Sequence, residues 1–309
     1  FRIAPLYYLG IAFYFIYFSV IDPLMKGGAV AASDRYSVFN VLANVFFIND
    51  FTPGAANNRV VPGGWSIGTE MTFYLLFPFL FFLYEKLKHR FWVIVSLPFL
   101  GVLFSIVIVK AMGIVAASIG FDTFYYYNTN NKFLYFNIVA HLPVFLTGMT
   151  LFYVAQRITA ISRDLKIVLG FLIVGLTIVG LIVYVQLPNI ISLVAFVPAL
   201  SFFCLFLLYK HVPWLSNQLL ARIGQLSFSI YLLHFVFVYE GSRLLPLLLQ
   251  SYLSTEVIFI INFFISLIIT CGLAALTEKY VEKPGIEMGR KIIKRIKNKR
   301  TALNQMVVE

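Results

Sequence analysis

Four side chains at the start of one apolar stretch have the types and the spacing that acid–base chemistry needs. In WSIGTEMTFYLLFPF (65–79), Trp65 is followed by Ser66, Glu70 and Tyr74, and these three recur every four residues. In a helix this spacing places them on one stripe. A carboxylate inside a membrane helix is costly and usually faces the helix bundle or a watery cavity. Glu70 is therefore either a structural carboxyl, protonated or paired with a neighbouring helix, or an acid, base or orienting group of a reaction site.

A second polar face lies in GQLSFSIYLLHF (224–235), where Ser227, Tyr231 and His234 recur at helical spacing. Histidine can carry protons near neutral pH. A single histidine in a helix bundle, however, is more often a hydrogen-bonded packing residue. No Asp follows His234 to orient its ring, so the pattern gives little support to a nucleophilic triad.

Three further patterns each have a functional and a structural interpretation. Arg2 fits a positively charged membrane anchor or a bidentate phosphate clamp. The aromatic and amide side chains of FDTFYYYNTNNKF (121–133) could stack on sugar rings, although an interfacial belt with a polar turn is the simpler interpretation. Asn262, Ser266 and Thr270, four residues apart, predict a polar stripe that packs one helix on another.

The composition identifies the environment of these residues. Of 309 residues, 61% are hydrophobic and 12% are charged, where an ordinary soluble domain has about 25% charged residues. A bilayer core needs about 20 consecutive apolar residues per helix. Eight stretches qualify, so we predict an all-α, polytopic membrane bundle and exclude a soluble protein. The stretches are 3–21, 65–84, 91–109, 136–155, 167–185, 190–209, 223–241 and 257–277.

Two shorter features complete the predicted architecture. The segment VFNVLANVFFI (38–48) is about three helical turns long and has Asn40 and Asn44 on one face, so we expect it to lie in the membrane interface. Cys204 and Cys271 both lie in apolar runs. They predict neither a disulfide framework nor a metal site.

The basic residues are distributed unevenly, which predicts an orientation. With residue 1 in the cytoplasm, 18 Lys and Arg fall in cytoplasmic segments and six in outer segments, as the positive-inside rule requires. We therefore expect both ends of this chain in the cytoplasm. Nine of the bases follow residue 278. This predicts a membrane domain at 1–288 and a basic tail at 289–309 that lies on anionic lipid as an amphipathic helix, with no need for nucleic acid as a partner.

Five segments, in order and at similar spacing, resemble the acyltransferase-3 family of membrane enzymes. The most specific is the motif Trp-Ser-x-Ser-x-Glu followed by Phe-Tyr, which Trp65, Ser66, Glu70, Phe73 and Tyr74 match. Gly68 stands in place of the second Ser, which leaves no hydroxyl for a role there. The segments are RIAPLYY (2–8), WSIGTEMTFYLLFP (65–78), LPVFLTGM (142–149), GQLSFSIYLLHF (224–235) and EKYVEKPGIEMGRK (278–291).

The resemblance implies an enzyme of the bacterial plasma membrane. Such enzymes move an acyl group, most often acetyl, from cytoplasmic acyl-coenzyme A to a hydroxyl of a surface or cell-wall carbohydrate. Arg2 matches the family's basic motif for the donor. His234 matches a Tyr-Leu-x-His pattern, and Glu282 belongs to a Glu-x-Pro pattern. The expected catalytic set is then Glu70, Ser66, Trp65, Tyr74 and His234, with no metal and no bound cofactor.

The family usually has ten helices, the first of which carries an Arg and a His regarded as catalytic. The resemblance implies that this chain starts where the third helix begins. We accordingly expect that the 309-residue chain alone inserts into a membrane but does not transfer acyl groups.

Two rival functions use the same residues differently. In a transporter or a flippase for a lipid-linked sugar, Glu70 and His234 would form a proton relay, although the sequence has no inverted repeat that favours this. A non-catalytic membrane scaffold is the third possibility. Only the enzyme would move label covalently from acetyl-coenzyme A to an acceptor.

Overall fold

The computed structural model describes residues 2–27, 34–52, 55, 60–118, 133–158, 160–187, 190–209, 211–215 and 217–306. These residues form helices and connecting segments without a strand. Eight helices are long and apolar enough to cross a membrane, which confirms the predicted all-α, polytopic bundle. They are Ile3–Met25, Gly64–Leu87, Phe91–Ser118, Phe133–Arg157, Arg163–Gln186, Ser192–Tyr209, Gln218–Leu249 and Thr255–Asn298.

The chain divides into two compact units, and each is described by itself. The first comprises Phe1–Tyr36, Val60–Gly64 and Ala221–Glu309, and the second comprises Ser37–Arg59 and Trp65–Leu220. The hydrophobic pattern gave no sign of this division, because every span is apolar along its length.

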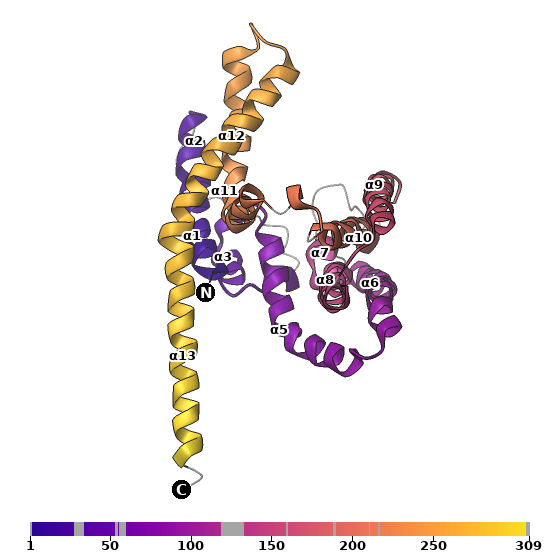
Figure 1. Cartoon of the computed structure of the whole chain (residues 1–309). Helices are drawn as coiled ribbons and strands as arrows, with labels where there is room; N and C mark the ends of the chain where they lie inside the picture. The colour runs from indigo at the N-terminus through magenta and orange to yellow at the C-terminus, as the bar shows by residue number, and fades with distance from the viewer. Residues whose placement is uncertain are drawn as a thin grey trace. The chain divides into compact units, whose positions relative to one another are not determined.

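The first unit consists of a broken N-terminal helix and the C-terminal helices. Its elements are α1 (Ile3–Ile16), the π-helix η1 (Tyr17–Ile21), α2 (Asp22–Met25), η2 (Asp34–Tyr36), most of α11 (Gln218–Leu249), α12 (Thr255–Thr277), the π-helix η5 (Glu278–Glu282) and α13 (Lys283–Met306). The ribbon of α12 continues through η5 into α13 without a break (Figure 1). The predicted basic tail is thus helical as far as Met306, and the helix that contains it begins at Lys283.

Polar contacts hold the helices of this unit together. Tyr14 of α1 donates a hydrogen bond to the Leu232 carbonyl of α11 at 2.7 Å. Asn262 of α12 donates to Ser242 of α11 at 3.1 Å and accepts from Ser266 at 3.0 Å. Asn262, Ser266 and Thr270 are all buried. The predicted polar stripe therefore packs between helices.

The second unit consists of the five central spans and the short helices beside them. Its elements are α3 (Val38–Val45), η3 (Asn49–Phe51), α5 (Gly64–Leu87), α6 (Phe91–Ser118), α7 (Phe133–Phe136), α8 (Ile138–Arg157), α9 (Arg163–Gln186), α10 (Ile191–Tyr209) and η4 (Pro213–Leu215). Within it, α8 packs against α6 and α10, and α10 packs against α9. The span predicted over 91–109 continues as one helix to Ser118.

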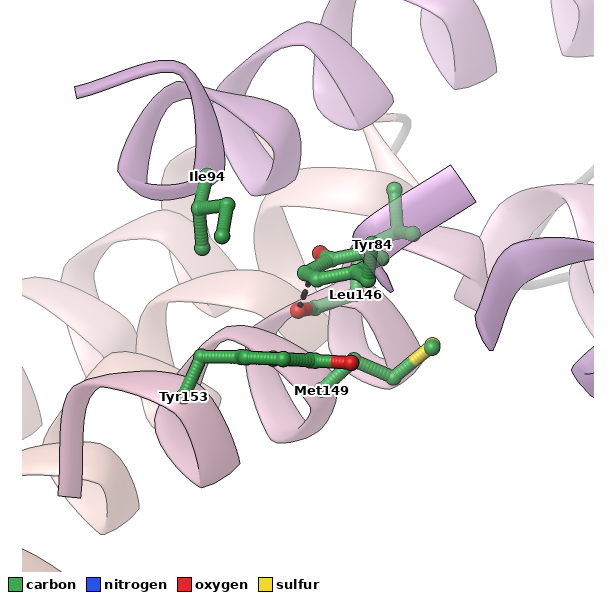
Figure 2. Close-up of a cluster of buried hydrophobic side chains, with 5 residues drawn as sticks. All are labelled: Tyr84, Ile94, Leu146, Met149 and Tyr153. Atoms are coloured by element: carbon green, nitrogen blue, oxygen red, sulfur yellow. Dashed lines mark hydrogen bonds between the residues drawn. The ribbon is translucent and has the colours of Figure 1, made fainter. Parts of the chain in front are cut away.

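Apolar side chains from three helices form a core in this unit. Figure 2 shows Tyr84 of α5, Ile94 of α6 and the α8 residues Leu146, Met149 and Tyr153. The Tyr84 hydroxyl donates to the Leu146 carbonyl at 3.0 Å. Buried tyrosines usually find such a partner. This core fixes the second half of α5 to α8.

The first half of α5, which carries the candidate site, is separated from that core by a proline. Pro78 lies inside α5 and removes a backbone hydrogen bond, which bends helices. The ribbon of α5 changes direction along its length in Figure 1. The N-terminal half of α5 is held by Phe73, which packs against that core, and by contacts of Thr69 with η3 and α7.

The short helix α3 is amphipathic in the way predicted for 38–48. Asn40 and Asn44 are buried on one side of it, while Val38 and Phe39 are exposed on the other. The Asn44 side chain donates to the Asn40 carbonyl at 2.8 Å. An apolar face that points away from the protein suits a helix in the membrane interface.

Candidate active site

Trp65, at the start of α5, is packed among aromatic rings of its own unit. Its ring stacks on Phe136 with centroids 4.7 Å apart and lies 5.1 Å from the ring of His141. The buried His141 is held by a hydrogen bond between its Nε2 and the Tyr135 carbonyl at 2.9 Å. Trp65 is therefore fixed in orientation and presents one partly exposed side.

Glu70 lies five residues further along α5, about 7 Å along the helix axis. It is half-buried, and its Oε1 accepts a hydrogen bond of 2.5 Å from the Tyr74 hydroxyl. Tyr74 is 50% exposed and Ser66 is half-buried. The predicted stripe thus exists, and its carboxylate bonds within its own helix, with no ion pair to any residue that the structure describes. A substrate can reach such a group.

A buried carboxylate that the sequence patterns do not predict lies directly beside this stripe. Asp50 of η3 is 1% exposed. The Thr69 hydroxyl of α5 lies 2.6 Å from Asp50 Oδ2, and the Asn49 side-chain amide donates to Asp50 Oδ1 at 2.8 Å. Burial raises the pKa of Asp50 from 3.8 to about 7, although the hydrogen bond from Thr69 opposes the rise. The only signal in the sequence was a polar pair inside the apolar run VFFINDF (45–51).

This polar pair explains why position 68 lacks a side chain. A Cβ at Gly68 would lie 2.7 Å from Asn49 Oδ1 and 3.0 Å from both carboxylate oxygens of Asp50. Real Cβ atoms do not approach other atoms that closely. The glycine that departs from the Trp-Ser-x-Ser-x-Glu motif is the residue that allows η3 to approach α5.

In the first unit, Arg2 belongs to a separate charged site at one end of the helices. Its Nε donates to Glu282 at 2.8 Å and its Nη2 donates to the Gln225 carbonyl at 2.8 Å. Glu282 is 1% exposed and also accepts from Ser229. The side chain of Arg2 is 44% exposed. The guanidinium is thus anchored on one edge, while its Nη1 side remains available to an anion.

A cavity of about 490 Å³ lies at this end of the unit. Arg2, Lys283 and Arg290 line it together with Glu278, Glu282 and Glu287. Two of these acids are committed to arginines, since Glu278 forms a bidentate pair with Arg222 at 2.9 and 2.7 Å. The predicted donor residue therefore lies in a cavity with basic groups on its wall.

The three polar residues predicted on α11 are each bonded to backbone. His234 Nδ1 donates to the Tyr231 carbonyl at 2.8 Å, so it carries the ring proton. The Tyr231 hydroxyl donates to the Gly63 carbonyl at 3.0 Å, and the exposed Ser227 donates to the Gly224 carbonyl at 2.9 Å. His234 packs against the ring of Phe235 with centroids 4.0 Å apart. These contacts are those of a packing histidine.

The opposite end of the first unit holds an ion-pair network that sequence reasoning also missed. Arg243 bonds to Glu240 at 2.6 Å and to Asp22 at 3.2 Å. Tyr17 donates to Glu240, and Lys26 pairs with Asp22 at 2.8 Å. The signal was present in the sequence as charges flanking two apolar stretches, but the spacing alone did not pair them.

Two further predictions concern an aromatic sugar-binding segment and metal ligands. The aromatic segment 121–132 lies outside the described residues. Among the residues that are described, no group of three or more His, Cys, Asp or Glu could hold a metal ion.

Comparison with known protein families decides the class. A family model described as an acyltransferase domain, that of acyltransferase-3, matches residues 1–279. The chain belongs to the acyltransferase-3 family. Neither the search of curated proteins nor the search of solved structures gave a match. The resemblance to this family is therefore confirmed over residues 1–279, and this acyltransferase-3 protein is a multi-pass membrane acyltransferase.

Proposed function

We propose that this acyltransferase-3 protein moves an acyl group, most simply acetyl, from cytoplasmic acyl-coenzyme A to a hydroxyl of an extracytoplasmic carbohydrate. The observation that carries the proposal is the accessible carboxylate of Glu70 on the polar stripe of α5, bonded to Tyr74 at 2.5 Å, on the same helix as the fixed ring of Trp65. A carboxylate placed within reach of a hydroxyl can act as a general base.

The reaction needs two proton transfers and the exchange of a carbon–sulfur bond for a carbon–oxygen bond. Glu70 takes the proton of the acceptor hydroxyl, and the oxygen attacks the carbonyl carbon of the thioester. The carbon–sulfur bond then breaks, and the coenzyme A thiolate leaves and takes up the proton from Glu70. Tyr74 orients the carboxylate through its hydrogen bond. Trp65 and Ser66 shape the acceptor side of the site. His234 of α11 is kept in the proposed catalytic set because it matches the family's Tyr-Leu-x-His pattern.

The donor would be held in the first unit by Arg2. Phosphates of coenzyme A are anions that a guanidinium binds through charge-assisted hydrogen bonds. The anchored edge of Arg2, on Glu282 and Gln225, orients the remaining edge. Lys283, which pairs with Glu278 at 3.6 Å, and Arg290 line the same cavity, where Glu278, Glu282 and Glu287 offset the basic charges.

The same residues support the proposed orientation in a bacterial plasma membrane, with both ends of the chain in the cytoplasm. Arg2 at the start of α1 bonds to Glu282 after α12, so both belong to one end of the unit, and the positive-inside rule assigns that end to the cytoplasm. On α13, Ile292, Ile293 and Ile296 are exposed beside basic residues. This supports the proposed membrane domain at 1–288 and the tail at 289–309 on anionic lipid.

The test is covalent transfer of label. Membranes from cells that express the chain together with the two further helices usual in the family, and matched membranes without the chain, are incubated with acetyl-coenzyme A labelled in the acetyl group and with a cell-wall glycan. We expect label in an ester on the glycan only with the protein, with release of free coenzyme A. Mass spectrometry of the glycan identifies the ester. Coenzyme A release without label in any acceptor would contradict the proposal.

A further inference from the structure

The carboxyl group of Asp50 is placed beneath the turn of α5 that carries the reactive stripe. Thr69, which it contacts at 2.6 Å, directly precedes Glu70. The same Thr69 hydroxyl lies 3.0 Å from the Phe136 carbonyl of α7 and 3.1 Å from the Trp65 carbonyl. One hydroxyl thus joins η3, α5 and α7 at the start of α5.

The hydroxyl has a single proton for three acceptors, so its bonds depend on the protonation state of Asp50. When Asp50 is ionised, Thr69 donates to it, and the Phe136 carbonyl loses that donor. When Asp50 is protonated, it donates to Thr69 Oγ1, and Thr69 is free to donate to the Phe136 carbonyl. Only the protonated form of Asp50 joins η3, α5 and α7 through one continuous series of hydrogen bonds.

Two observations independent of the pKa indicate that the contact between Asp50 and Thr69 has a specific role. Gly68 has no side chain where a Cβ would come within 3.0 Å of Asp50 and Asn49. Asn49 Oδ1 is also buried, and within the described part of the chain it has no hydrogen-bond partner. Buried acceptors normally have donors. A purely structural contact would be expected to supply a donor to Asn49 Oδ1, and none is found within the described residues.

We propose that Asp50 is a positioning residue of the transfer site, which in its protonated form locks Thr69 between η3 and α7 and so holds Trp65 and Glu70 in the productive arrangement. The proposal rests on the proposed function. Because Asp50 is 1% exposed, it acts through Thr69 and does not touch the substrate.

The other titratable groups on the elements around Asp50 are already engaged. Glu70 on α5 accepts from Tyr74. Tyr135 of α7 offers its carbonyl to His141 of α8, whose ring also packs on Trp65. No ion pair in the described ranges includes Asp50. Desolvation is therefore the main influence on its titration, and it places the pKa near 7.

The test is the pH dependence of kcat/KM for acetyl transfer. For a pKa of about 7, a step that needs protonated Asp50 slows about tenfold between pH 6 and pH 8. Asp50→Asn keeps a donor toward Thr69 at every pH, so the decline should disappear. Thr69→Val, which keeps the shape and removes the hydroxyl, should lower kcat/KM and also remove the decline.

The outcomes separate this proposal from the one on which it rests. Absence of transfer by the wild-type protein would overturn the proposed function. Transfer whose decline above pH 6 persists in both Asp50→Asn and Thr69→Val would overturn the role of Asp50 and leave the function intact. If Asp50→Asn does not reach the membrane, Thr69→Val alone decides, because an unchanged pH profile in that variant contradicts the proposal.

Discussion

Two buried carboxylates, Glu282 in the first unit and Asp50 in the second, are each 1% exposed but have opposite surroundings. Glu282 accepts from the guanidinium of Arg2 at 2.8 Å, whereas Asp50 has a hydroxyl and an amide as its partners. A cation offsets the cost of burying a negative charge, and neutral donors offset less of it. Glu282 is therefore suited to anchor a charged partner, and Asp50 to gain and lose a proton.

The largest expected difference is the effect of pH on stability through Asp50. Its folded pKa, about 7, is above the unfolded value, so the folded state binds the extra proton. The contribution of Asp50 to stability is then greatest below pH 4 and falls by about 1.4 kcal/mol per pH unit as pH rises from about 4 to about 7. Thermal unfolding of the purified protein should show this decline, and Asp50→Asn should reduce it. A decline of the same slope in the variant would assign it to other groups.

Removing the charge of Glu282 should be the next largest effect. Glu282→Gln leaves Arg2 without its ionic partner, and loss of one member of a buried pair costs several kcal/mol. Because Arg2 is partly exposed, we expect a loss of about 2 kcal/mol, measured by unfolding in detergent. The matched control is Glu256→Gln, at an exposed position of α12. Equal stability of the two variants would contradict the anchoring role.

The close approach of η3 to α5 predicts a cost at position 68. Gly68→Ser should destabilise the protein by about 1–3 kcal/mol, because overpacking forces neighbouring atoms to shift. Gly148→Ser on α8 is the control, since nothing lies within 4 Å of a Cβ there. If the unfolding midpoints of both variants equal that of the wild type, then Asp50 and Asn49 do not pack against Gly68 as described.

The smallest of these effects concerns the partner of Glu282. Arg2→Ala should raise the KM for acetyl-coenzyme A about tenfold, the value of one charge-assisted hydrogen bond, and leave the KM for the glycan unchanged. The KM of Arg2→Lys should lie between those of the wild type and Arg2→Ala, because lysine keeps the charge but lacks the bidentate guanidinium. An unchanged donor KM in Arg2→Ala would make the residue a membrane anchor only.

Features that depend on hydropathy and helical spacing were predictable from the sequence. The eight spans, the polar stripe with Glu70 and Tyr74, and the packing role of Asn262 all follow from residues three or four apart in one helix. Contacts between distant segments were not predictable. Asp50 meets Thr69 only because η3 folds back onto α5, and Glu282 meets Arg2 across 280 residues.

For the site residues, too, the sequence predicted the helix face but not the contact partners. Spacing placed Ser227, Tyr231 and His234 on one face, but it did not reveal that each bonds to backbone. Gly68 was read as the loss of a hydroxyl, whereas its neighbours show that it makes room for a carboxylate. Sequence patterns identify which helix face is polar, and only the packing identifies what that face meets.

The most direct test of the claim that Glu70 is the general base compares acyl transfer by variants of two carboxylates of α5. Glu70 accepts from Tyr74, and Glu85, near the other end of the helix, accepts from Tyr153 at 2.8 Å, so each Glu→Gln change removes a charge next to a tyrosine hydroxyl. In membranes containing equal amounts of protein, Glu70→Gln should lower the rate of labelled acetyl transfer by about a hundredfold or more, the usual contribution of a general base, and Glu85→Gln should transfer at near wild-type rate. Transfer by Glu70→Gln at the wild-type rate would contradict the account.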